Sequence, residues 1–275
     1  MKDDRTFSFR VGAVLIGIVC ISALVSFLYT PYDPYAIHAA QHFFPPSPQH
    51  WFGTDNFGRD NFSRAITGAR YSLFVACTTV ALSGICGIAL GLLSGYVGGV
   101  LDEIILRLTD ALSSFPAVLT ALVAITVFSG GKFAIVPALA LAFLPSFIRL
   151  TRSGTMRLKN RDFIQAAYVS GASRARIMFR HLLPNLLPTM IPAVVIGLSN
   201  AILAESGMSY LGLGIQPPIP SWGRMLFEGQ SYLFRAPWET LSAGLMMILT
   251  VLGFHLLGDR KSTRLNSSHS SVSRM

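Results

Sequence analysis

Long apolar runs without Asp, Glu, Lys or Arg divide this chain of 275 residues. A run of about 20 apolar residues can cross a bilayer as an α-helix. Five runs approach or exceed this length, and a shorter sixth contains Pro137 and Pro145, so we expect it to be kinked. Prolines are tolerated in membrane helices because neighbouring groups satisfy the freed carbonyls. The pattern predicts an all-α integral membrane protein with six transmembrane helices: Val11–Tyr29, Tyr71–Gly95, Ala111–Gly131, Phe133–Ile148, Leu186–Ala204 and Leu241–Leu257.

Composition supports a membrane protein and argues against two other kinds of site. Hydrophobic residues make up 52% of the chain and charged residues only 13%, whereas soluble domains carry about 25% charged residues. The net charge is +9, but the basic residues lie between apolar runs rather than on one basic face, so we expect no nucleic acid partner. Cys20, Cys77 and Cys86 lie inside apolar runs without the spacing of metal ligands, so we expect no metal site.

Lys and Arg gather on one side of the predicted membrane. Short cytoplasmic loops carry an excess of these residues. With the N-terminus inside, the outer loops carry the smaller set, Arg59, Arg64, Arg70, Lys132, Arg224 and Arg235. The inner segments carry Lys2, Arg5, Arg10, Arg107, Arg149, Arg152, Arg157, Lys159, Arg161, Arg174, Arg176, Arg180 and Arg260. We therefore expect both termini, and the basic segment Arg161–Pro184, to lie in the cytoplasm.

The basic segment reads as two short helices joined by a glycine turn. Asp162 and Gln165 have the spacing of a capping pair, which predicts a helix over Phe163–Ser170. Gly171 suits the left-handed position that ends a helix. Ser173 can cap a second helix, Arg174–Leu183, which we expect to stop at Pro184 because proline cannot continue it.

Two roles for this segment remain open from the residues alone. Ala166 and Ala167 offer small side chains where another protein could approach closely, beside Phe163 and Tyr168. The arginines of the second helix would equally suit an amphipathic helix that lies on anionic lipid.

Small residues recur every four positions in the second apolar run. Ser83, Gly87, Gly91 and Gly95 share one helix face. Such a stripe lets another helix approach closely where lipid offers no hydrophobic drive. We expect a helix-packing face here, and chance recurrence in a glycine-rich run is the alternative.

The stretch QAAYVSGASRARIMFRHLLP resembles the EAA loop of ATP-binding-cassette (ABC) importer permeases, whose pattern is E-A-A-x3-G-x9-I-x-L-P. Gln165 and His181 depart from it, because glutamate and isoleucine are usual there. The resemblance implies that this loop is the coupling helix, which seats in a groove of a cytoplasmic ATPase. It implies ATPase coupling through Gln165, Ala166, Ala167, Gly171, Ala172, Ser173, Leu183 and Pro184.

Three further stretches, Trp51–Leu73, Gly95–Pro116 and Glu205–Leu226, are similar to the C-type permease of dipeptide, oligopeptide and nickel importers. This resemblance implies six helices, of which the last five form a type I importer (MetI-like) core. It also implies a second permease subunit, two ABC ATPase subunits that hold ATP and Mg²⁺, an extracytoplasmic binding protein, and a place in the cytoplasmic (inner) membrane. Peptides are the expected ligand, with nickel chelates, glutathione and oligosaccharides as alternatives, and no substrate-binding residue is assigned.

Absent motifs narrow the mechanism. Gly130-Gly131-Lys132 does not have the spacing of a P-loop, and neither H-E-x-x-H nor G-x-S-x-G occurs. We expect no catalytic residue and no cofactor in this chain. The predicted spans contain no Asp or Glu, which argues against an ion-coupled carrier. A membrane-bound enzyme or scaffold is the remaining alternative class.

Three regions follow from these patterns. Residues 1–70 form a cytoplasmic segment, an uncleaved first helix and an outer loop. Residues 71–260 form the five-helix core, with the coupling loop at 149–185. The serine- and arginine-rich tail, 261–275, has no periodicity, and we expect it to be disordered or non-native.

Overall fold

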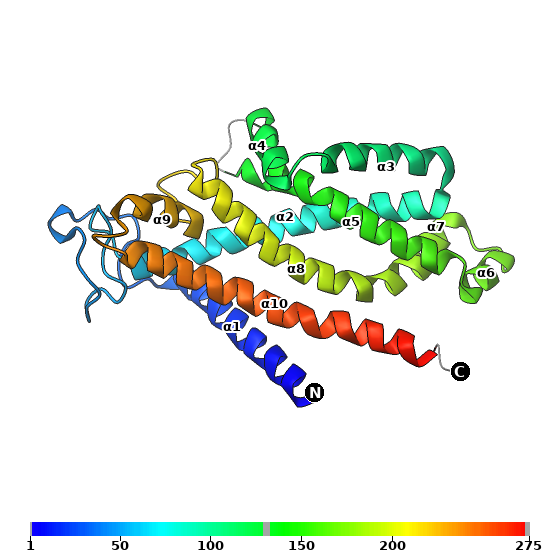
Figure 1. Ribbon diagram of the computed structural model, residues 1–275, viewed down its shortest axis with the longest axis horizontal. Helices are drawn as coiled ribbons and strands as arrows, with labels where there is room; N and C mark the ends of the chain where they lie inside the picture. The colour runs from blue at the N-terminus through cyan, green and yellow to red at the C-terminus, as the bar shows by residue number, and fades with distance from the viewer. Residues whose placement is uncertain (1, 129–132, 273–275) are drawn as a thin grey trace.

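The computed structural model describes residues 2–128 and 133–272, with side chains for residues 7–128 and 133–258. Long helices dominate it, and no β-strand occurs within these ranges. The long helices are α1 (Lys2–Leu28), α2 (Asn61–Val97), α5 (Ile135–Lys159), α8 (Leu183–Tyr210) and α10 (Trp238–Val272). They run along the long axis of the molecule (Figure 1). The prediction of an all-α protein is confirmed.

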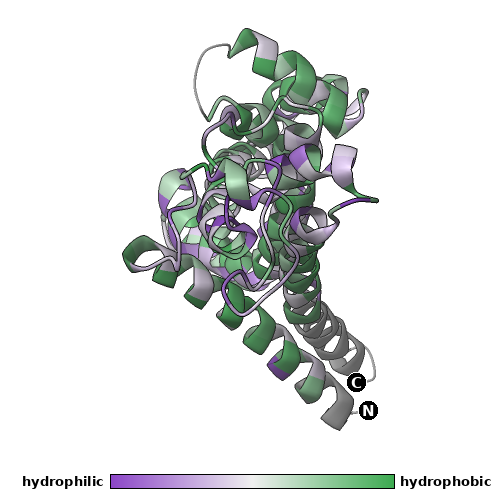
Figure 2. Cartoon of the chain, turned by 90° about the vertical axis from the view of Figure 1, so that its left-hand side faces the viewer, coloured by the Kyte–Doolittle hydropathy of each residue, from purple (hydrophilic) through white to green (hydrophobic). Residues whose placement is uncertain are grey.

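Shorter elements gather at the two ends of the bundle. One end carries α6 (Asp162–Val169), α7 (Arg174–Arg176) and the π-helical turn η2 (Ile177–Leu182). The other end carries α9 (Trp222–Gly229), the 3₁₀ turns η1 (Ala39–Gln41) and η3 (Gln230–Tyr232), and long loops. Seen from this second end, many polar residues lie in the loops, while the long helices are largely hydrophobic (Figure 2). Both chain termini point away from α9, toward the α6 end (Figure 1).

The third predicted span is broken in the structure. Among the described residues, five helices are long and apolar enough to cross a membrane, or six if α3 (Gly99–Ser113) and α4 (Ala117–Val127) form one span. These two helices are bent by 97°, so a straight helix over Ala111–Gly131 is wrong. Pro116 lies in the break with extended backbone (φ −53°, ψ 137°), because its ring cannot continue a helix. Residues 129–132, with the glycines and lysine of the failed P-loop comparison, lie outside the described residues.

The small-residue stripe of α2 lies against α5. A Cβ atom added to Gly91 would lie 2.5 Å from the carbonyl oxygen of Ile148 and 2.8 Å from Cβ of Thr151. One added to Gly95 would lie 2.8 Å from Cβ of Thr155. The other stripe residues, Ser83 and Gly87, are also buried. The two backbones therefore approach more closely than larger side chains would allow.

The second helix of the basic segment does not stop at Pro184, so that prediction is wrong. The chain stays helical over Arg174–Tyr210, because η2 widens the turn before the proline. The N–H of Leu183 bonds to the carbonyl of Met178, five residues back. Pro184 then lies in the first turn of α8, where a missing N–H is tolerated.

The last helix continues farther than we expected. Its apolar part ends at Gly258, but the backbone of α10 is helical to Val272. Residues 261–272, which we expected to be disordered or non-native, thus have helical backbone. This stretch contains neither Gly nor Pro, so it lacks the residues that most often terminate a helix. Residues 273–275 lie outside the described residues.

The main hydrophobic core forms where α1, α2, α8, α9 and α10 meet. Its fully buried members include Val19, Ala76, Ile202, Trp222 and Ala243. Trp222 is the first residue of α9, and its indole N–H also bonds to the carbonyl of Ala65 at 3.0 Å. The short helix at the loop-rich end is thereby anchored to the membrane helices.

Candidate functional site

The start of α6 differs from the prediction. Arg161 is the N-cap residue, with extended backbone and no capping hydrogen bond from its side chain. Asp162 is already the first helical residue, so the capping pair of Asp162 and Gln165 is wrong. The Asp162 carboxylate still lies at the helix N-terminus, where negative charge is favourable.

The end of α6 forms a Schellman motif around Gly171. Gly171 has φ +77°, and its N–H bonds to the carbonyl of Tyr168 at 3.0 Å. The N–H of Ala172 bonds to the carbonyl of Ala167 at 3.1 Å. This pair of bonds satisfies carbonyls at a helix end, and glycine adopts the left-handed conformation without strain. The predicted glycine turn is confirmed.

Ser173 caps the next helix, as predicted. Its hydroxyl oxygen accepts the N–H of Arg176 at 3.3 Å. Arg174, Arg176 and Arg180 are exposed, so the segment after the turn presents several positive charges to its surroundings.

One face of α6 packs into a hydrophobic cluster to which several helices contribute. Ile164 is only 4% exposed and packs with Leu92 of α2, Ile177 and Leu182 of η2, and Leu186 of α8. The partly buried residues of the cluster are Tyr96, Leu158, Ala167, Ala172, Met178 and Leu183. α6 therefore shares one closely packed cluster with α2 and α8.

The opposite face of α6 is exposed. Val169 is 86% exposed, and Ala166 is exposed beside it. Tyr168 is 67% exposed, although it lies four residues after Ile164 and so nearer the buried face. Ala167 instead faces the bundle, because it lies three residues after buried Ile164 and so on the same helix face. The expectation that both alanines face outward is correct for Ala166 and wrong for Ala167.

A cavity of about 310 Å³ separates part of α6 from the end of α2. Gln165 lines it together with the basic residues Lys159 and Arg174. A glutamate at position 165, as in the EAA pattern, would bring an acid beside these two cations. Gln165 gives the cavity a polar but uncharged group there.

Polar contacts that the motif did not indicate hold the helices beside this site. Arg152 of α5 forms a two-pronged ion pair with Asp102 of α3, with both N···O distances 2.6 Å. The ammonium group of Lys159 donates to the carbonyl of Tyr96, near the end of α2, at 3.2 Å. Two-pronged arginine pairs fix geometry as well as adding energy, so α3 and α5 are held in one arrangement.

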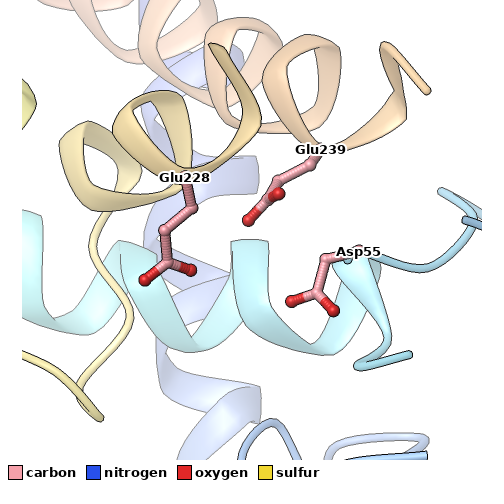
Figure 3. A group of neighbouring side chains, drawn as sticks. All are labelled: Asp55, Glu228 and Glu239. Carbon is pink, nitrogen blue, oxygen red and sulfur yellow. The ribbon is translucent and has the colours of Figure 1, made fainter. Parts of the chain in front are cut away.

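Three carboxylates meet at the other end of the bundle. Asp55 comes from the loop that precedes α2, Glu228 from α9 and Glu239 from α10 (Figure 3), and their oxygens lie within 4.8 Å of one another. Oxygen ligands of this kind can bind a divalent cation. Three arginines lie among them: Arg59, Arg64 and Arg224. These arginines form ion pairs with Asp55 and Glu228, so the group is an ion-pair network that ties the loop to the helices.

Glu228 is the central acid of this network. Arg59 and Arg64 bond to one of its oxygens at 2.8 and 2.7 Å, and Arg224 bonds to the other at 2.8 Å. Burial alone would raise the pKa of Glu228, but the charge of Arg64, the hydrogen bond from Arg224 and the charge of Arg59 hold that pKa below its usual range. The carboxylate is therefore stabilised in its ionised form.

The structure also buries an acid that the sequence reading placed outside the spans. α8 extends beyond Ala204 to Tyr210, so it contains Glu205, which is 0% exposed. Its carboxyl oxygens accept hydrogen bonds from the hydroxyls of Ser72, Ser206 and Ser209. The statement that the spans lack acids is wrong, because buried apolar positions such as Met208 continue the helix past the charge-free run.

Comparison with known proteins decides the family. A family model described as "Binding-protein-dependent transport system inner membrane component" matches residues 87–267, which include α6 and the small-residue stripe from Gly87 onward. A dipeptide transport system permease protein, DppC, of Alkalihalophilus pseudofirmus is 37% identical over 249 residues, covering 90% of this chain and 82% of that protein. The chain belongs to the binding-protein-dependent transport system inner membrane components.

This inner membrane component is also similar to an oligopeptide permease and to the fold of one solved transporter structure. An oligopeptide transport system permease protein, OppC, of Bacillus subtilis is 32% identical over 249 residues, covering 90% of this chain and 82% of that protein. A structure of the MetNI methionine ABC transporter in inward-facing conformations has a TM-score of 0.60 and 18% identity, covering 72% of this chain and 94% of that one. At that identity the likeness supports the MetI-like fold alone. Family membership, rather than a lack of buried acids, is what argues against an ion-coupled carrier.

Proposed function

We propose that this chain is one transmembrane permease subunit of an ABC importer that moves di- and oligopeptides into the cell. Its family and the names of its dipeptide and oligopeptide relatives support this function. A second permease subunit completes the pathway, and an extracytoplasmic binding protein delivers the ligand. Nickel chelates, glutathione and oligosaccharides are the alternative ligands.

Two ATPase subunits dock at the α6 end and supply ATP and Mg²⁺ chemistry that this chain does not perform. The observation that carries this proposal is that α6 is buried on one face and exposed on the other. Ile164 fixes one face to the bundle, while Ala166, Tyr168 and Val169 are exposed on the helix. An exposed apolar face on a seated helix suits a protein groove.

Closure of the ATPase dimer around ATP would displace α6, and the shared cluster would pass this displacement to α2 and α8. The bundle would then alternate between inward-open and outward-open arrangements. ATP drives the change only through its tighter binding to the closed dimer, because a ligand shifts an equilibrium only by its differential affinity.

The α6 end faces the cytoplasm in this proposal, and the protein lies in the cytoplasmic membrane. The basic residues around α6, including Arg161, Arg174 and Arg180, support this orientation by the positive-inside rule. Both chain termini point toward this end (Figure 1), so both would be cytoplasmic.

A charge placed on the exposed face of α6 tests the docking role. We expect Ala166→Arg to release the ATPase subunits when the tagged complex is purified in mild detergent, because a bulky cation enters a close contact. Ala40→Arg, at an exposed alanine of η1 at the opposite end, is the matched control and should retain them. Ala167→Arg is a poor docking test, because it would disturb the cluster around Ile164.

Retention of the ATPases by Ala166→Arg would overturn the docking assignment. Tighter binding of the same variant to anionic vesicles would then favour the lipid-surface helix. For the ligand, a reconstituted system that takes up nickel chelates or oligosaccharides but no peptide would refute the peptide proposal.

A further inference from the structure

Glu205 stands at the centre of two hydrogen-bond relays that the coupling mechanism does not use. In the first, the N–H of Ile215 donates to Ser209 Oγ at 3.2 Å, and this hydroxyl donates to Glu205 Oε1 at 2.7 Å. In the second, the N–H of Trp222 donates to Ser72 Oγ at 3.3 Å, and that hydroxyl donates to Glu205 Oε2 at 3.2 Å. Each of the two oxygens of the Glu205 carboxyl group thus accepts the serine hydroxyl of one relay.

The two relays hold the two ends of one segment. Residues 215–222 form the second part of the connection between α8 and α9 at the loop-rich end of the bundle and end at the first residue of α9. Three prolines, Pro217, Pro218 and Pro220, lie within it, so much of its backbone has no N–H with which to bond to the helices. Ile215 and Trp222, at its ends, supply the N–H groups that reach the serines.

The two glycines that flank this segment, Gly214 and Gly223, also lie directly on α8. A Cβ atom added to Gly223 would lie 2.5 Å from Cα of Ser206. One added to Gly214 would meet Ser209. This fit leaves no room for the two ends of the segment to shift toward α8, and the relays stop them from moving away.

We propose that Glu205 is a positioning residue that locks segment 215–222, and with it the start of α9, onto the outer ends of α2 and α8. A carboxyl oxygen accepts the single hydroxyl proton of each serine, which turns the serine lone pairs toward the backbone N–H groups. Ser72 belongs to α2 and Glu205 to α8, so the lock also ties two membrane helices together.

This lock serves transport because segment 215–222 lies at the end opposite α6, where the binding protein would deliver the ligand. That part of the inference rests on the proposed function. A segment that is already held in place loses no further conformational entropy when a partner docks. Without the lock, docking would have to order it, and affinity for the partner would fall.

Amide hydrogen exchange on the complete detergent-purified complex tests the lock without any transport assay. We expect Ser209→Ala to speed exchange at Ile215 and Ser72→Ala to speed it at Trp222, each roughly tenfold from the loss of one bond. Glu205→Gln should speed exchange at one or both, because its amide nitrogen cannot accept a serine proton. Ser199→Ala, at a buried α8 hydroxyl without a hydrogen-bond partner among the described residues, is the control and should change neither amide.

Equal protection of both amides in wild type and Glu205→Gln would overturn the proposal, as would faster exchange in Ser199→Ala. The transport role has a separate readout, the stimulation of ATP hydrolysis by liganded binding protein. We expect Glu205→Gln to raise the half-saturating concentration of that protein roughly threefold to tenfold, with little change in the maximal rate. An unchanged half-saturating concentration would refute the transport role of the lock, whereas a wild-type complex without any stimulation would refute the proposed function instead.

Discussion

Replacing Gly91 by alanine should force α2 and α5 apart. The added methyl carbon would lie 2.5 Å from the carbonyl oxygen of Ile148, 2.8 Å from Cβ of Thr151 and 3.0 Å from the backbone nitrogen of Arg152. Ordinary contacts begin at 3.4 Å, so the carbonyl must retreat by about 0.9 Å. Two of the three contacts are backbone atoms, so a side-chain rotation cannot relieve them and the helices themselves must move.

The expected cost can be set against the helix propensity of alanine. Overpacking a core costs about 1–3 kcal/mol, while alanine is favoured over glycine inside a helix by about 1 kcal/mol. Gly91→Ala should therefore be destabilised by about 0–2 kcal/mol. Gly244→Ala in α10 gains the propensity term alone, because no heavy atom lies within 4 Å of its added Cβ.

The comparison of these two variants isolates the clash. We expect the free energy of unfolding in detergent to differ between them by about 1–3 kcal/mol, roughly fivefold to 150-fold in the unfolding equilibrium. Denaturant titration of the full chain, followed by helical circular dichroism, measures it. If both alanines stabilise the chain equally, α2 and α5 are not closely packed at Gly91 and the packing account is wrong.

Three further changes test other contacts. Gly171→Val places a branched residue at φ +77° and should destabilise the end of α6 by about 1–2 kcal/mol. In co-purification, this variant should retain less ATPase than Gly171→Asn does. Equal retention by the two variants would contradict a need for glycine. Arg152→Ala and Asp102→Ala should each lower the free energy of unfolding. The double variant should lose less than the sum of the two single losses, because one ion pair accounts for both. Additive losses of unfolding free energy would count against the pair. The lowered pKa of Glu228 means that the folded state binds fewer protons than the unfolded state just below the usual Glu pKa of about 4.3. Stability should therefore fall as pH drops through that range, and the slope of unfolding free energy against pH should be shallower in Glu228→Gln; identical slopes would show that the acid is not held by its arginines.

Much of the local structure around α6 was predictable because its signals are local. Gly171 and Ser173 are read from turn and capping chemistry, which depends on neighbours along the chain. The helix start at Asp162 and the continuation past Pro184 were not predictable in the same way. There the N-cap backbone at Arg161 and the widened turn η2 override the simple residue preferences.

Neighbouring residues in the sequence do not indicate which element packs against each helix face. A stripe of small residues indicates that some helix comes close, but only the packed bundle identifies it as α5. A pair of adjacent alanines looks symmetrical in the sequence, and the position of Ile164 in the shared cluster decides that Ala167 faces inward.

The sequence by itself determined the class of the protein: its apolar runs, their approximate lengths, the imbalance of Lys and Arg, and the EAA-like loop. These features depend on composition and on spacing along the chain, which can be read without knowing how the chain folds. The tertiary structure alone decided that Glu205 lies at the meeting point of two serine relays and that Glu228 lies among three arginines. Burial of a charge is set by residues far away in the chain, because only the assembled helices exclude water and bring the compensating donors into reach.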